Sequence, residues 1–326
     1  MTGKTRWGIL GTGAIARKFA EGLQSATGAQ LLAVGSRASD TAEAFGQKFA
    51  VPRRYGSYAE LAGDPDVDVI YVATPHPFHL ENSLACIEAG KAVLCEKPLT
   101  VNARQAERLI KAARLGKVFC MEAMWTRFLP SLVKVRELLA QQAVGEIRMV
   151  IADFGFRAGW NPEGRLLNLH YAGGGLLDVG IYPLALASMV LGKPATISSQ
   201  AHIGATGVDE QAAVVLGYAG GQLATLSCCV MARTPQQAWI LGTEGMIHIH
   251  EPWWRSTKIT LQAGADSRDI DLPMKGNGYN YEAEEVMRCL AAGKLESPTM
   301  PLEESLELMR TMDRIRAQWG LKYPME

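Results

Sequence analysis

GTGAIA, at residues 11–16, follows a short apolar run, Trp7 to Leu10, and opens an amphipathic stretch of helical length. This G-x-G-x-x-A pattern is typical of a strand that turns into a helix beside a diphosphate group. Gly11 permits the tight turn, Gly13 lets the backbone approach a pyrophosphate, and the small Ala16 lets helix and strand pack closely. Backbone N–H groups at the helix start face the phosphates, and the helix dipole favours negative charge there. The residues predicted to contact the phosphates are Gly11, Gly13, Ala14 and Ile15.

As far as Met121, short apolar runs alternate with amphipathic stretches. Such alternation implies βαβ crossovers, and hence a parallel sheet with helices on both faces. This context makes the glycine motif specific, because the motif alone also occurs by chance in other turns. We predict a doubly wound α/β domain of the Rossmann type. The predicted strands are Trp7 to Leu10, Leu31 to Gly35, Val69 to Ala73, Ala92 to Cys95 and Val118 to Met121, and the clearest helical stretches are Phe78 to Ala89 and Ala103 to Leu115.

The pattern changes after Pro130. A helix is followed by a strand, a glycine-started helix at Leu176 to Leu191, and then strand-like runs with little helix between them. The two runs joined by Ala219-Gly220-Gly221 predict a hairpin, and the whole predicts an α+β domain with an open, largely antiparallel sheet. The runs that predict strands are Ile147 to Phe156, Ile197 to His202, Ala212 to Tyr218, Gln222 to Cys229, Gln237 to Leu241 and Met246 to His250; the other helices are Ser131 to Ala140, Tyr281 to Ala292 and Leu302 to Trp319.

The length of the chain, 326 residues, exceeds the ~100–200 expected of one domain, so two domains are expected. We assign residues 1–123 to a cofactor-binding domain and residues 124–326 to a substrate-binding and dimerisation domain. The last helix, 302–319, is a candidate to pack back on the first domain. The segment between them, Glu122 to Pro130, has no flexible linker, so we expect closely coupled domains.

The charges argue against large polyanionic partners. The chain has 33 Lys and Arg residues against 33 Asp and Glu residues, so no bulk field attracts nucleic acid or an anionic membrane. No run of the ~18 apolar residues that a membrane span needs is expected, and the N-terminal apolar run is too short for a secretory signal. We therefore expect a soluble protein whose ligand is small and nearly neutral.

The six cysteines show no C-x-x-C spacing and no ladder of short intervals that would suggest a disulfide framework. Four of them lie in apolar runs that predict strands, where reduced cysteine behaves as a small hydrophobic residue. We therefore expect a reducing, cytoplasmic compartment. The cysteines are Cys86, Cys95, Cys120, Cys228, Cys229 and Cys289.

The end of the second strand distinguishes NAD from NADP. An NAD site usually places an acid there, ~20 residues after the glycines, to accept hydrogen bonds from the ribose 2′-hydroxyl. Here Ser36 and Arg37 follow the strand, and a guanidinium holds a 2′-phosphate in a bidentate grip. The nearest acid, Asp40, has Glu43 three residues later and is better explained as a helix N-cap. We predict NADP; the alternative for Arg37 is a solvated surface residue.

Two further segments carry a family resemblance. The first, Ala73-Thr74-Pro75-His76-Pro77-Phe78-His79, begins at the end of the predicted strand Val69 to Ala73. The second, Cys95-Glu96-Lys97-Pro98, begins at the end of the next predicted strand. With the N-terminal glycines, they resemble the glucose-fructose oxidoreductase and inositol dehydrogenase family over essentially the whole chain. Residues 121–128, MEAMWTRF, and 173–183, GGGLLDVGIYP, are similar to the branch of dimeric trans-dihydrodiol dehydrogenases and NADP-dependent D-xylose dehydrogenases.

This resemblance implies that the Glu96-Lys97-Pro98 turn lies beside the nicotinamide, with Lys97 near the reacting carbonyl or alcohol. Many family members carry D-x-x-x-H in the second domain, with the histidine as acid and base. Here Asp178 is followed four residues later by Tyr182, a change that the dihydrodiol dehydrogenase branch shares. The resemblance therefore implies tyrosine as the alternative proton donor, and substrates of the histidine-containing sugar dehydrogenases do not transfer directly.

Oxidation of a secondary alcohol needs a base for the hydroxyl proton while the cofactor takes the hydride. On a helix from about Leu176, Asp178 and Tyr182 share one face. A free phenol titrates near ~10, and lowering this by about two units takes roughly 2.7 kcal/mol of preferential interaction, which a close ammonium such as Lys97 can supply. Asp178 then orients Lys97 or binds a substrate hydroxyl. The structural alternatives are a core tyrosine and a surface lysine.

Thr74, Pro75, His76 and His79 are expected to line the nicotinamide pocket. No metal site is expected, because Pro77 breaks the helical spacing of the two histidines and no third ligand is nearby; His248 and His250 likewise lack partners at zinc spacing. Trp125 and Trp160 fall next to the recognised motifs and are predicted to contact substrate, since aromatic faces suit the C–H faces of sugars and cyclic diols. Core packing is the alternative for both.

The leading hypothesis is reversible, NADP-linked oxidation of a secondary or anomeric hydroxyl on a sugar, a cyclic polyol or a dihydrodiol. A reductase of a keto-sugar such as an anhydrofructose is the alternative within enzymes. A non-catalytic NADP-binding regulator is the alternative of another class, because fold does not determine function. We also expect a homodimer through the C-terminal sheet, since its apolar strands present a face that two terminal helices are too few to cover.

Overall fold

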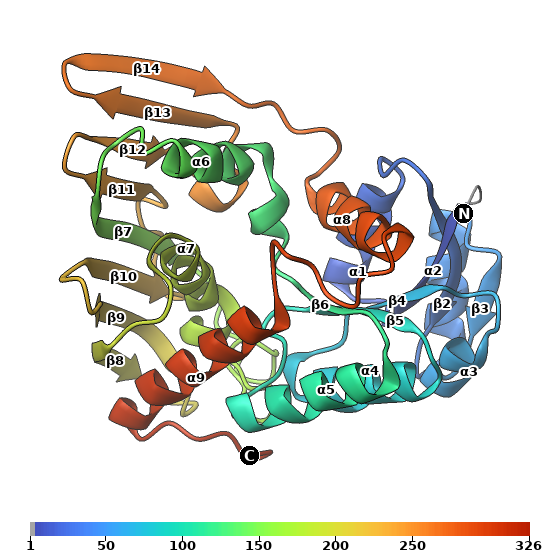
Figure 1. Cartoon of the computed structure of the whole chain (residues 1–326). Coiled ribbons are helices and arrows are strands. Elements are labelled where there is room, and N and C mark those ends of the chain that lie inside the picture. Colours follow the sequence, from blue (N-terminus) through green and yellow to red (C-terminus); the bar gives the residue numbers. More distant parts are fainter. Residues whose placement is uncertain (1–3) are drawn as a thin grey trace. The chain divides into compact units, whose positions relative to one another are not determined.

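The computed structural model describes residues 4–326, which form two compact units (Figure 1). Unit 1 runs from the start of the described chain to Phe128 and takes up Lys275–Leu306; unit 2 comprises Leu129–Met274 and Glu307–Glu326. These units differ from the predicted division at 123/124, because a late segment returns to unit 1. Helix α8 (Tyr279–Ala291) packs there on α1 (Ala14–Leu23). A Cβ on Gly22 would lie 2.8 Å from Tyr279 Cβ, so the two helices touch at a glycine.

Unit 1 confirms the predicted doubly wound sheet. In the described chain its six strands are all parallel and lie in the order β3-β2-β1-β4-β5-β6, so the direction of winding reverses between β1 and β4. Ligands of such sheets bind outside the carboxyl ends of the strands at this reversal. The strands are β1 (Thr5–Leu10), β2 (Ala29–Gly35), β3 (Arg53–Tyr55), β4 (Val69–Val72), β5 (Ala92–Glu96) and β6 (Cys120–Ala123).

The strands of unit 1 alternate with helices, as predicted. Each residue of β4 and β5 is buried, which suits a parallel sheet covered on both faces. The helices are α1, α2 (Ser39–Phe49), α3 (Tyr58–Gly63), α4 (His79–Glu88) and α5 (Ala103–Gly116). The short segments β3 and α3 were absent from the expectation, because three residues with two arginines and a six-residue helix carry too little periodicity.

Unit 2 contains an eight-stranded open sheet in the order β14-β13-β12-β11-β7-β10-β9-β8 (Figure 1). Among the described strands, β7 and β10 pair in parallel and the other neighbours are antiparallel, so the predicted largely antiparallel sheet is confirmed. The strands are β7 (Ile147–Gly155), β8 (Thr196–Ile203), β9 (Asp209–Gly217), β10 (Leu223–Cys229), β11 (Ala238–Gly242), β12 (Gly245–Ile249), β13 (Lys258–Ala263) and β14 (Asp266–Asp271).

Helices of the described chain pack on one face of this sheet, and side chains on the other face are exposed. Helix α7 (Ile181–Leu191) packs on β7 and β10, and α6 (Pro130–Ala140) lies beside α7, where Arg136 Nη1 is 3.5 Å from Met189 Sδ. Strand β9 alternates buried and exposed residues along its length. This period of two is the pattern of a strand with one face in the core and one in solvent.

The longest apolar helical stretch, Leu169–Leu191, corrects the expectation that no segment is long and apolar enough for a membrane span. By length and composition this stretch meets that condition. However, 78% of its most apolar window is buried inside the structure. It therefore packs as the core helix of unit 2, which explains why both its faces are hydrophobic.

All six cysteines are buried and carry free thiols. Burial raises the pKa of the Cys86 and Cys120 thiols to about 12, which keeps them protonated and unreactive at neutral pH. The cysteines therefore act as small apolar core residues, as expected for those in the predicted strands; Cys86 and Cys289 lie on helices.

Candidate active site

The glycine loop between β1 and α1 has the shape that a dinucleotide needs. Gly11 has φ +105°, and an added Cβ would lie 3.0 Å from the Ala73 carbonyl oxygen. At Gly13 an added Cβ would meet no described atom within 4 Å, so the backbone is open to an approaching group. No described side chain caps α1, which leaves the first N–H groups of the helix to a ligand. Ala16 is fully buried against the strand. These residues fit a pyrophosphate.

The corner after β2 carries polar and cationic groups. Ser36 Oγ is 2.6 Å from Thr41 Oγ1, and the Arg37 guanidinium lies 5.9 Å from the centre of the Phe78 ring. Burial raises the pKa of Tyr58, and the neighbouring Arg37 guanidinium counteracts part of that rise. Thr41 and Tyr58 are therefore two residues of this corner that the sequence did not reveal.

Helix α2 begins at this same corner. It starts at Ser39 with Ala38 as N-cap, so the expectation that Asp40 is the N-cap is wrong. Asp40 lies in the first turn instead, where its Oδ1 accepts the Thr41 N–H at 2.8 Å. The Asp40 carboxylate therefore forms its hydrogen bond within the first turn of its own helix.

Buried side chains form hydrogen bonds with the Glu96-Lys97-Pro98 turn. Tyr71 Oη on β4 donates a short hydrogen bond to Glu96 Oε1, and Glu96 Oε2 accepts the Lys97 N–H at 3.2 Å. Beyond the cis Lys97–Pro98 peptide, the Leu99 N–H donates to Glu122 Oε1 at 2.9 Å. Burial raises the pKa of Glu122 to about 7. The Lys97 backbone is thus anchored on both sides.

His79 lies between the Glu96-Lys97-Pro98 turn and the loop after β4. It is fully buried at the start of α4, with Nδ1 2.8 Å from the Pro98 carbonyl oxygen and Nε2 2.7 Å from the Thr74 carbonyl oxygen. The His76 ring stands edge-on to it at 5.7 Å, and Thr74 Oγ1 accepts a hydrogen bond from Asn82 Nδ2 at 3.1 Å. His79 therefore connects the loop after β4 to the turn after β5.

Helix α8 adds an acid that the sequence did not reveal. Glu282 is fully buried, and burial together with the charge of Glu96 raises its pKa well above the usual range. Neighbouring Tyr279 stacks on Trp125, with ring centres 4.6 Å apart and planes at 14°. Trp125 is itself only 6% exposed. It therefore packs within unit 1, as the structural alternative expected, while its contact with substrate stays a prediction.

In unit 2, Asp178 and Tyr182 lie at the start of the core helix. Asp178 is in a π turn, Leu176–Gly180, and Tyr182 is the second residue of α7. Turns of this type are frequent at functional sites. Arg165 Nη1 donates to Asp178 Oδ1 at 2.8 Å, and the Tyr182 ring lies 5.3 Å from that of Phe154. Arg165 was not identified from the sequence.

A buried acid requires the middle one of the three glycines before this turn. Gly174 has φ +113°, and a Cβ there would overlap Asp209 Oδ1. Asp209 Oδ2 accepts the Leu176 N–H at 2.6 Å and so holds the start of the helix from β9. Burial raises the pKa of Asp209 to about 7. The loop before the glycines carries Trp160, whose 59% exposure leaves it available to a ligand.

Two comparisons of sequence now identify the chain. A family model described as "Oxidoreductase family, NAD-binding Rossmann fold" matches residues 5–124, and a model of the GFO/IDH/MocA C-terminal domain matches residues 132–248. The chain belongs to the GFO/IDH/MocA oxidoreductase family. Trans-1,2-dihydrobenzene-1,2-diol dehydrogenases are 42% identical to it in Danio rerio, 40% in Mus musculus and 38% in Homo sapiens, each over 98% of both chains. The family resemblance predicted from the motifs is confirmed.

Solved structures of the family show the same fold. An aldose-aldose oxidoreductase from Caulobacter crescentus, complexed with glycerol, superposes with a TM-score of 0.89 at 24% identity and covers 97% of this chain and 98% of its own. A 3-ketoreductase from Actinomadura kijaniata, in complex with TDP-benzene and NADP, has a TM-score of 0.83 at 25% identity, with 96% and 97% covered. As a member of the GFO/IDH/MocA family, this chain is an oxidoreductase that acts on CH–OH groups.

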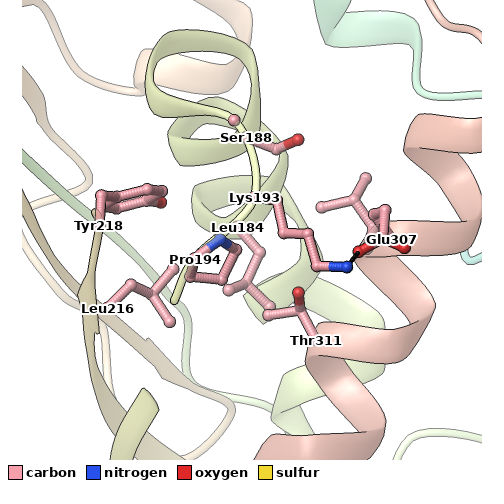
Figure 2. A pocket seen from close by; sticks show the side chains of 10 residues that line it. Leu184, Ser188, Lys193, Pro194, Leu216, Tyr218, Glu307 and Thr311 are labelled. Atoms are coloured by element: carbon pink, nitrogen blue, oxygen red, sulfur yellow. Dashed lines mark ion pairs between the residues drawn. The ribbon is translucent and has the colours of Figure 1, made fainter. Parts of the chain in front are cut away.

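A separate hollow of about 250 Å³ opens to solvent in unit 2. Figure 2 shows Lys193 extending to Glu307, which it meets at 2.8 Å, with the Tyr218 ring on the opposite side. Its lining contains none of the GFO/IDH/MocA motif residues, so we do not assign it to the oxidoreductase site.

Among residues 4–326 there is also no group of three His, Cys, Asp or Glu residues placed to hold a metal ion.

Proposed function

We propose that this chain is an NADP-dependent dehydrogenase that moves hydride between the nicotinamide and a secondary or anomeric hydroxyl of a dihydrodiol, a cyclic polyol or a sugar. The observation that carries the proposal is its end-to-end similarity to named dihydrodiol dehydrogenases, at 38–42% identity over 98% of both chains. Similarity of this extent favours a shared reaction class, and the cyclic diols therefore come first among the candidate substrates.

The choice of NADP is supported by the corner after β2. No carboxylate ends that strand, and Ser36, Arg37 and Thr41 offer two hydroxyls and a guanidinium at the start of α2. A 2′-phosphate there would gain charge-assisted hydrogen bonds and the favourable end of a helix dipole. The stacking of Arg37 near the Phe78 ring gives the guanidinium a defined place.

The proton chemistry is assigned to Tyr182, with Lys97 and Asp178 as its partners. When bound, the nicotinamide supplies the hydride chemistry. Tyr182 Oη takes the hydroxyl proton in oxidation and returns it in reduction, while the Lys97 ammonium stabilises the phenolate. Asp178, whose Oδ1 is held by Arg165, orients the donors of this group. Trp160 and Trp125 are the proposed aromatic contacts of the substrate ring.

Keto-sugar reduction is the second candidate. The 3-ketoreductase of the same fold favours it, because a reversible site of this kind runs in either direction. The two candidates differ in which substrate is turned over and which form of the cofactor is consumed.

We also propose that the chain forms a homodimer through the uncovered face of its eight-stranded sheet. Ile151, Val215 and Leu223 are about two-fifths exposed, and Thr225 pairs with both Ile151 and Val215, so these side chains form a continuous row on that face. A second copy of the chain would bury this patch.

The buried, reduced thiols support a cytoplasmic location.

The test is a panel of cyclic diols, aldoses and keto-sugars assayed with both cofactors by nicotinamide absorbance. We expect turnover of a cyclic diol or aldose with NADP and much weaker turnover with NAD. In the same assay Arg37→Ala should weaken NADPH binding far more than NADH binding, because only NADPH carries the 2′-phosphate. Arg17→Ala, an exposed arginine of α1, serves as the control. Equal losses for the two cofactors in Arg37→Ala would remove the NADP assignment.

A further inference from the structure

We propose that His79 is a buried imidazolium, protonated on both ring nitrogens, that positions the Glu96-Lys97-Pro98 turn against the loop after β4. This inference rests on the proposed cofactor site and gives His79 a positioning role in it.

Two backbone carbonyl oxygens lie at hydrogen-bond distance from the ring nitrogens of His79. Nδ1 lies 2.8 Å from the carbonyl oxygen of Pro98, and Nε2 lies 2.7 Å from that of Thr74. A carbonyl oxygen only accepts hydrogen bonds, whereas a neutral imidazole has one N–H donor and one bare acceptor nitrogen. A neutral His79 would therefore hold one lone pair against a carbonyl lone pair at hydrogen-bond distance. The imidazolium, with two donors, satisfies both contacts.

Burial opposes this charge, because an ion without compensation is costly in the interior. Two charge-assisted hydrogen bonds offset that cost, since bonds of this type are about twice as strong as neutral ones. Two acidic groups lie next to the turn that carries Pro98: Glu96 ends β5 two residues before Pro98, and Glu122 on β6 accepts the Leu99 N–H. The titratable groups on the elements around the ring include His76, Cys95, Glu96, Lys97 and Glu122, together with Tyr71 on β4 and Glu81, Cys86 and Glu88 on α4.

The two bonds join segments that the proposed function uses. Thr74 follows β4, Pro98 follows β5, and these strands are neighbours in the sheet. Loss of one proton from His79 must break one of the bonds, so the turn that carries Lys97 would separate from the loop after β4. We therefore expect cofactor affinity to fall as His79 deprotonates at alkaline pH.

The direct test is NMR of the full chain with ¹⁵N-labelled histidine and no ligand. We expect N–H protons on both ring nitrogens of His79 at pH 7.5, with the signals assigned by their loss in His79→Gln. The exposed His170 provides the internal reference for a ring in contact with solvent. A His79 ring with a single protonated nitrogen at pH 7.5 would overturn the proposal, and this result needs no variant to fold.

The second test measures NADPH affinity by fluorescence between pH 6 and pH 10. The wild type should lose affinity over the pH range in which the NMR shows His79 losing a proton. His79→Gln, which can donate to only one of the two carbonyls in this geometry, should bind roughly tenfold more weakly and lose that pH dependence. His170→Gln should match the wild type. Wild-type affinity and pH profile in His79→Gln would contradict the positioning role.

These outcomes separate the inference from the proposed function. If the wild type binds no NADPH at all, the cofactor assignment fails while the NMR result still decides the charge of His79. If NADPH binds but the ring is neutral, the proposed function stands and the inference fails.

Discussion

Glu282 is a carboxyl group on α8 whose two oxygens have no hydrogen-bond partner among the described residues. It is fully buried, and burial followed by the charge of Glu96 raises its pKa well above that of an ordinary glutamate. Glu96 in turn accepts the hydrogen bond of Tyr71, so a single proton on Glu282 avoids two buried negative charges side by side. Burial and the charge of Glu96 therefore both favour the protonated, neutral form of Glu282.

This state gives a stability prediction with a definite sign. A raised pKa means that the folded state keeps a proton that the unfolded chain has lost above pH ~4.3, so wild-type stability falls as pH rises beyond that value. Glu282→Gln replaces the neutral acid with a neutral amide of the same shape. We expect it to match the wild type near pH 5 and to exceed it in free energy of unfolding at pH 8, measured with urea.

The exposed Glu21→Gln on α1 is the control and should show no such difference between the two pH values. A Glu282→Gln chain that is less stable than the wild type at pH 8 would show that the ionised carboxylate is stabilising, contrary to its buried setting.

At the scale of elements, the start of the core helix depends on a tertiary contact. The π turn from Leu176 and α7 behind it begin where Asp209 of β9 accepts the Leu176 N–H. The left-handed Gly174 leaves room for that carboxylate. The place of Asp178 and Tyr182 therefore depends on a contact between Leu176 and Asp209, which are 33 residues apart in the sequence.

Gly174→Ala tests this dependence. The new Cβ adds both a strained φ and an overlap with Asp209, whereas Gly192→Ala, at φ +75°, adds the strain in open space. Strain of this type costs about 1–3 kcal/mol. We expect urea unfolding to show a loss within that range for Gly192→Ala and a clearly larger loss for Gly174→Ala. Equal losses would mean that the Asp209 side chain moves aside with no further loss in the free energy of unfolding.

The sequence predicts those elements whose signals are local. The glycine loop of α1 and the alternating strand β9 follow from periodicity and glycine chemistry within a few residues. Polar β14, with the sequence DSRDID, pairs with β13 at the edge of the sheet, and its sequence contains no alternating apolar pattern that would predict a strand. The return of α8 to unit 1 depends on its fit at Gly22, which no local pattern encodes.

The candidate site divides in the same way. Lys97 and Tyr182 stand out because short motifs surround them. Arg165, Asp209 and Glu282 act through partners at distant positions, and the sequence shows each of them as an ordinary charged residue. Contacts of this kind become visible only when the strands and helices are placed.

At the scale of the whole molecule, the open face of the eight-stranded sheet predicts a dimer of the 35.3 kDa chain. Ile151→Lys places a charge in the exposed apolar row and should give a folded monomer in sedimentation at micromolar concentration. Leu115→Lys, at an exposed leucine of α5 in unit 1, should leave the dimer intact. A wild-type monomer at that concentration would contradict the interface.

We propose that Tyr182 carries the proton with the help of Lys97. The most direct measurement is steady-state turnover of Tyr182→Phe, Lys97→Met and the double variant on the best substrate, with NADPH affinity measured in parallel. Tyr182→Phe should bind NADPH nearly as the wild type does and lose turnover by ~10²–10⁴, the range for a missing general acid or base. Lys97→Met should also lose turnover, and its remaining activity should need a higher pH.

Because the two side chains act as one unit, the double variant should be little worse than the poorer single variant. Phenylalanine keeps the ring contact with Phe154, so a tyrosine with only a packing role would keep its turnover when replaced. A Tyr182→Phe enzyme that retains more than about half of the wild-type turnover would contradict the account, since general acid–base catalysis contributes far more than a factor of two.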